Sequence, residues 1–93
     1  MRIIGHIEHP HLKITIFKMD NRVSVKFESG LYEQTYKLGD DERFQTPESI
    51  QKLMDMAFVE SVLTQMQQMH QNRLSALSRH FPAAENETFE EII

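Results

Sequence analysis

The chain contains no cysteine, and this absence narrows the chemistry that its 93 residues can support. Without a thiol there is no disulfide bond, no thiolate nucleophile, no zinc knuckle and no iron–sulfur cluster. A metal site would have to be built from the five histidines and the carboxylates.

Glycine, proline and long apolar runs are also scarce. Three glycines, three prolines and a hydrophobic content of 40% are typical of one globular domain, not of a disordered or fibrous chain. The start, MRIIGHIEH, lacks the apolar run of about 7 or more residues that a signal peptide needs. No stretch approaches the ~20 apolar residues of a membrane span. We therefore expect a cytoplasmic protein that is not associated with a membrane.

The net charge of −4 is unevenly distributed. Residues 1–38 hold six Lys or Arg against four acids, whereas residues 39–93 hold four against ten. The basic half favours either an anionic partner or complementary charges within a dimer.

The first 38 residues alternate between apolar and polar side chains, which predicts half-buried antiparallel strands. Asp20-Asn21 and Ser29-Gly30 are suited to two-residue hairpin turns with positive φ. The apolar face of the resulting four-stranded meander collects Ile3, Gly5, Ile7, Leu12, Ile14, Ile16, Val23, Val25, Phe27, Tyr32, Gln34, Tyr36 and Leu38.

The two turns also predict which residues face each other, because pairing counts outward from a turn. About Asp20-Asn21, the expected pairs are Ile16 with Val25, Ile14 with Phe27, and Lys13 with Glu28. About Ser29-Gly30, they are Phe27 with Tyr32 and Lys26 with Glu33. Opposite charges then share the outer face, as cross-strand energetics favour.

A helix is predicted over residues 46–81, after a polar connector at 39–45. Thr46 is suited to the N-cap, Pro47 to the first helical position, and Pro82 ends the pattern. The expected fold is α+β: a four-stranded antiparallel meander sheet packed against one long C-terminal α-helix. Residues 1–81 form the domain, and the acidic tail 82–93 is expected to be flexible.

The helix is too long for its own sheet. Its 34 or so residues span ~51 Å, whereas an eight-residue strand spans ~27 Å. Either the helix breaks near Gln68, or its second half overhangs and packs against a second subunit. We favour a homodimer, with an interface formed by Leu63, Met66, Leu74 and Leu77.

The segment GHIEHPHL gathers three of the five histidines and is the candidate metal site of this sequence. Strand alternation permits a three-ligand patch of His6, Glu8 and His11. No second shell or pocket is evident, and Lys13 would repel a cation. We therefore expect no bound metal and no cofactor.

The outer face of the sheet suggests a second kind of site. A basic sheet with an exposed aromatic resembles the way some proteins stack single-stranded RNA bases. Such proteins usually present two or three aromatics, whereas one is predicted here. The residues for nucleic-acid binding would be Arg2, Lys13, Phe17, Arg22 and Lys26.

The run MRIIGHIEHPHLKITIFKMDNRVSVKFESGLYEQTYKL, followed by a methionine-rich helix, resembles small conserved hypothetical proteins of Bacteroidetes bacteria. The resemblance extends to Phe81 and implies no activity and no site residues. The chain also lacks a phosphate-binding loop, a nucleophile elbow and a His-Glu-x-x-His helix. The sequence thus favours a non-catalytic, homodimeric interaction or structural module. A nucleic-acid-binding module is the alternative, and a metal-dependent enzyme is the third.

Overall fold

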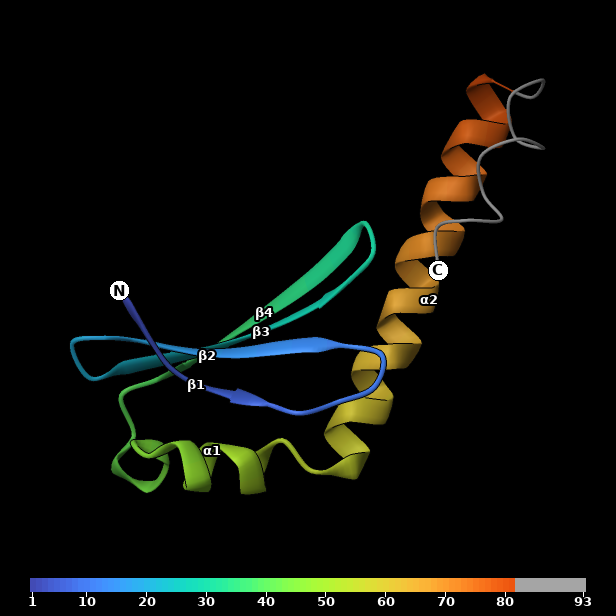
Figure 1. Ribbon diagram of the computed structural model, residues 1–93. Coiled ribbons are helices and arrows are strands. Elements are labelled where there is room, and N and C mark those ends of the chain that lie inside the picture. The colour runs from blue at the N-terminus through green and yellow to red at the C-terminus, as the bar shows by residue number, and fades with distance from the viewer. Residues whose placement is uncertain (82–93) are drawn as a thin grey trace.

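The computed structural model describes residues 1–81 and is an α+β domain (Figure 1). Four strands, β1 (Arg2–Ile7), β2 (Lys13–Met19), β3 (Arg22–Ser29) and β4 (Tyr32–Gly39), form one antiparallel sheet in the order β1-β2-β3-β4. A 3₁₀ turn, η1 (Glu42–Phe44), leads into α1 (Pro47–Leu53) and the long α2 (Met56–His80). The predicted meander and C-terminal helix are confirmed. The prediction of a flexible tail at 82–93 lies outside the described residues.

The β2–β3 hairpin has the predicted register. Ile14 is opposite Phe27 and Ile16 is opposite Val25, while Lys13 is opposite Glu28 on the other face. Asp20 takes a φ of 55°, as the first residue of a tight primed turn requires.

The predicted register of the β3–β4 hairpin was wrong by two residues. Gly30, with a φ of 58°, is the first residue of the turn, and Leu31 is the second. Lys26 therefore faces Thr35, and the two acids Glu28 and Glu33 face each other. Because strand side chains alternate with period two, this shift leaves every side chain on its predicted face.

Strand β1 contains a β-bulge between Ile3 and Gly5, which corrects its predicted facing. Gly5 is opposite Ile16, but Ile3 is opposite Phe17 and therefore lies on the outer face. There it is 56% exposed instead of buried. The bulge also moves Arg2, which is opposite Lys18, to the face away from Phe17.

The predicted single helix is instead two helices joined at an elbow. Thr46 is the N-cap of α1, as predicted, and it also forms a capping box with Ser49. The backbone of Met54 ends α1 with a φ of −83° and a ψ of 60°. The Asp55 side chain then accepts a hydrogen bond from the Phe58 backbone N–H (3.0 Å) and starts α2. The break thus lies at Met54–Asp55, and α2 continues unbroken through Gln68.

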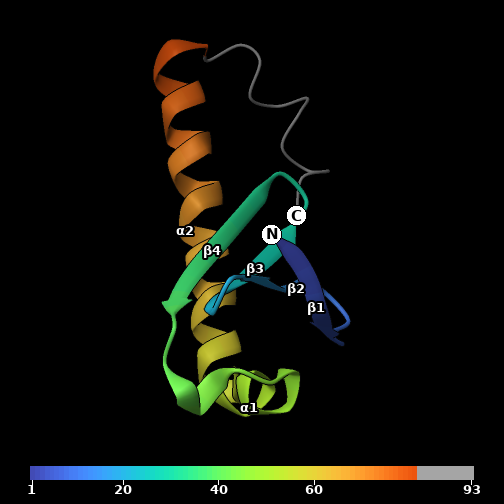
Figure 2. The ribbon, with the colours of Figure 1, turned by 90° about the vertical axis from the view of Figure 1, so that its left-hand side faces the viewer.

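The core lies between the inner face of the sheet and the two helices, which cover the same side (Figures 1 and 2). Phe27, at its centre, stacks on Phe58 of α2 with ring centroids 5.7 Å apart. The buried apolar residues are Leu12, Ile14, Ile16, Val23, Val25, Phe27, Tyr32, Ile50, Met54, Val62 and Met66. Within residues 1–81, no helix is long and apolar enough to cross a membrane.

Candidate functional site

Two side-chain hydrogen bonds tie α2 to β4 and mark how far the sheet reaches along the helix, and a third, within β4, supports one of them. Gln34 Nε2 donates to the Val62 carbonyl (3.0 Å), and the Tyr36 hydroxyl donates to Gln34 Oε1 (2.6 Å). About two turns further along α2, the Tyr32 hydroxyl lies 3.0 Å from Nδ1 of His70. The helix ends ten residues beyond His70. Its distal turns run past the tip of the β3–β4 hairpin (Figure 1).

The structure divides the four predicted interface residues into two pairs. Met66 is only 3% exposed within the intramolecular core, and Leu63 packs against that core. The premise that the sheet cannot reach this pair was wrong, because the elbow places the first half of α2 over the sheet. Leu74 and Leu77 are half-buried and, within residues 1–81, do not belong to the core cluster or pack against it. Phe81 follows, with 61% of its surface exposed.

The elbow creates a groove of about 530 Å³ between the β1–β2 loop, the end of α1 and the start of α2. Its apolar lining includes Ile7, Met54, Val59 and Leu63. Its charged lining is of one sign, with the carboxylates of Glu8, Asp55 and Glu60 and no Lys or Arg; Ile14, His9, Gln51 and Met56 complete the lining. Sequence patterns did not predict this groove, because they did not predict the elbow that forms it.

On the outer face of the sheet, the structure keeps four of the five predicted nucleic-acid residues. Lys13 and Arg22 are exposed, while Lys26 lies over Phe17 with Nζ 5.3 Å from the ring centroid. Lys26 also forms an ion pair with Glu28 (3.6 Å). Arg2 does not belong to this surface. The face therefore offers one half-buried aromatic ring, one side of which already contacts a lysine.

The N-terminal histidines are not assembled into a metal site. His6 lies on the outer face opposite Thr15, whereas Glu8 follows the end of β1 and lines the elbow groove. In the loop, His9 Nδ1 accepts a hydrogen bond from the His11 backbone N–H (3.0 Å). Within residues 1–81, no group of three or more His, Asp or Glu side chains could hold a metal ion.

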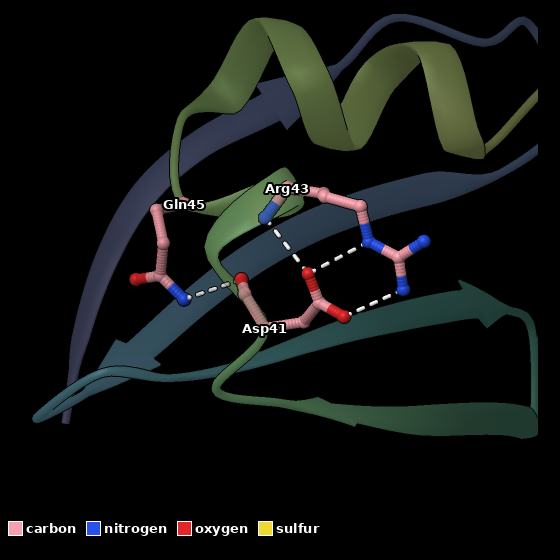
Figure 3. Close-up of polar contacts among 3 residues, drawn as sticks. All are labelled: Asp41, Arg43 and Gln45. Atoms are coloured by element: carbon pink, nitrogen blue, oxygen red, sulfur yellow. Dashed lines mark hydrogen bonds and ion pairs between the residues drawn. The ribbon is translucent and has the colours of Figure 1, made fainter.

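A cluster of polar contacts lies at η1, in the segment that the sequence analysis interpreted as a polar connector (Figure 3). Arg43 donates from Nε and Nη2 to the two carboxylate oxygens of Asp41 (2.9 and 2.6 Å), and its backbone N–H donates to the same carboxylate (2.8 Å). These hydrogen bonds lower the pKa of Asp41 from 3.8 to about 2 and raise the pKa of Arg43. Gln45 Nε2 bridges the carbonyls of Asp41 (3.0 Å) and Asn21 (2.9 Å).

This cluster is structural, because the Asp41 carboxylate, Arg43 Nε and Nη2, and Gln45 Nε2 already have partners within the protein, and of its atoms only Gln45 Oε1 is buried without a hydrogen bond among the described residues. It holds the connector against the β2–β3 turn. A surface cavity of about 730 Å³ lies beside it, lined by Arg43, Phe44, Thr46, Glu48, Ser49, Lys52 and Leu53. Its Arg43, Thr46 and Ser49 are engaged in the ion pair and the capping box, so they do not converge on a ligand.

Comparisons of the chain with models of protein families, with curated proteins and with solved structures find no match. The structure is a two-layer α+β domain in which one helix extends past the sheet. The resemblance to Bacteroidetes proteins stays a prediction.

Proposed function

We propose that this protein is a small cytoplasmic interaction module that works as a homodimer through the distal half of α2. The observation that supports this best is that α2 continues for ten residues past its last hydrogen bond to the sheet, at His70. Over this length Leu74 and Leu77, three residues apart, share one face of the helix, and Phe81 follows as the C-cap of α2.

Burial of this face supplies the energy for association. Each large apolar side chain contributes roughly 1.5 to 3 kcal/mol when it is fully buried. Leu74 and Leu77 are already half-buried in one chain, so each contributes only part of this free energy on association. In a two-fold dimer both chains contribute, so four leucine side chains are buried. The free energy gained by burying these side chains offsets the entropy lost on association. An unpartnered stripe of this kind would also promote aggregation.

Light scattering of the full chain at tens of micromolar tests the proposal. The wild type should have twice the chain mass of 11.0 kDa, and the double variant Leu74→Glu with Leu77→Glu should be a monomer. The matched control is Gln71→Glu with Ser75→Glu, which adds the same charge at exposed positions of the same turns and should stay dimeric. A wild-type monomer would contradict the proposal.

A second candidate function is binding of single-stranded nucleic acid on the outer face. It is favoured by the β3–β4 register, which gathers Glu28 and Glu33 at one end and leaves Arg22 and Lys37 away from them. Binding of this kind weakens steeply with salt, because bound phosphates release counterions. Titration with single-stranded RNA at low and high salt tests it, with Arg22→Glu and Lys37→Glu as the variants that should lose affinity.

A further inference from the structure

The two ends of α2 carry opposite charge. Between Leu53 and Leu63 the chain has two carboxylates, Asp55 and Glu60, and no Lys or Arg. From residue 61 to 80 it has no carboxylate, and the last turn carries Arg79 and His80. The carboxylates near the N-terminus of α2 and the basic residues at its C-terminus both interact favourably with the helix dipole. Because the two ends have opposite charge, they would also attract each other between two chains.

The acidic end adjoins the elbow groove, which has an apolar lining. Val59 and Leu63 line the groove from α2, Ile7 lines it from the sheet, and Met56 lies at its rim with 77% of its surface exposed. Glu8 adds a third carboxylate from the β1–β2 loop. A fitting occupant therefore has apolar side chains and positive charge, in a segment narrow enough to lie along α2.

The distal end of α2 has this chemistry. Val59, Leu63, Leu74 and Leu77 share one helix face, because Leu74 follows Leu63 by eleven positions, which is about three turns. When two such helices pair antiparallel about a two-fold axis, the proximal half of this face on one chain meets the distal half on the other.

We propose that the elbow groove is the docking site for the distal α2 of a second copy of this chain. Leu74 and Leu77 of one chain pack against the apolar lining of the groove, and Arg79 lies among its carboxylates. Each chain offers one helix end and one groove, so the assembly closes at two copies. This inference rests on the proposed dimer and adds the surface that receives the helix.

Because the chain has no cysteine, a pair of introduced thiols can test this contact directly. Met56→Cys places a thiol at the groove, and Ser78→Cys places one in the exposed distal turn. Equal amounts of the two variants, mixed and treated with a short bismaleimide, should give mainly the mixed cross-linked dimer. As a matched control, Thr35→Cys on the exposed face of β4 should not cross-link to Ser78→Cys.

Charge reversal provides a second readout. Glu60→Arg should weaken the dimer severalfold, since it sets like charges together, and Glu60→Arg combined with Arg79→Glu should recover most of the loss. Glu33→Arg makes the same change far from the groove, on β4, and should leave dimerisation unchanged.

The possible outcomes separate the two proposals. A wild-type protein that scatters as a monomer overturns both. A dimer that cross-links only between two Ser78→Cys chains overturns the groove contact and leaves the dimer standing. A mixed cross-link together with weakening by Glu60→Arg supports both. If Glu33→Arg weakens the dimer as much as Glu60→Arg does, the groove carboxylates are not the partner of Arg79.

Discussion

The hydroxyl of Tyr32, at the start of β4, lies 3.0 Å from Nδ1 of His70 in the middle of α2. The two rings meet edge to face, with centroids 5.9 Å apart. This pair joins the tip of the β3–β4 hairpin to the helix. It is also the last side-chain hydrogen bond between sheet and helix along the described part of α2.

Tyr32→Phe should lower the free energy of unfolding by about 0.5 to 1.5 kcal/mol, because His70 loses its partner while the ring stays in place. Urea unfolding of Tyr32→Phe, His70→Leu and the double variant would give the coupling between the two residues. Additive effects would show that the hydrogen bond contributes nothing to stability.

Val25→Asp should unfold the domain. Val25 is fully buried opposite Ile16, and an unpaired carboxylate there costs several kcal/mol. Its neighbour Lys26 points to the outer face, so Lys26→Ala should change stability by no more than ~1 kcal/mol. Circular dichroism during thermal unfolding compares the two. A Val25→Asp variant that melts like the wild type would show that the inner face is wrongly assigned.

The Asp41 and Arg43 pair predicts a contribution to stability that depends on pH. The folded pKa of Asp41, about 2, lies below its ordinary value of 3.8, so the unfolded chain binds a proton more readily than the folded one. The contribution is therefore complete above pH ~4 and is lost as the pH falls toward 2. The difference in stability between wild type and Asp41→Asn, measured by urea unfolding, should be constant near neutral pH and shrink over that acid range. A difference independent of pH would contradict this account.

Asp55→Ala should destabilise the protein by about 0.5 to 2 kcal/mol, since it removes the N-cap of α2. Asp40→Ala, which removes an exposed carboxylate that does not cap a helix, is the matched control and should be close to neutral. If both variants unfold at the same urea concentration as the wild type, the elbow does not depend on this cap.

Local patterns in the sequence were sufficient for the strands and for one of the registers. Alternation of apolar residues identifies a strand because its side chains point to opposite faces in turn. At Asp20-Asn21 the turn position was correctly predicted, and the β2–β3 register followed. At Ser29-Gly30 it was not, because a glycine takes a positive φ equally well as the first or the second turn residue. The register then depends on how the whole hairpin packs.

The candidate site depended on tertiary structure. The apolar spacing of Ile50, Leu53, Met54, Ala57 and Phe58 runs through the elbow without interruption, so periodicity alone predicts one helix. The helices instead turn at Met54, which is buried beneath them. The groove is formed by the loop after β1 and the start of α2, which lie some fifty residues apart in sequence. A local sequence pattern cannot predict a contact between segments so far apart. The sequence by itself determined the four strands, the start of α1 and the opposite charges at the two ends of α2, because these depend on neighbouring residues. Packing decided the elbow, the facing of β1 and the groove, because each depends on contacts between distant segments.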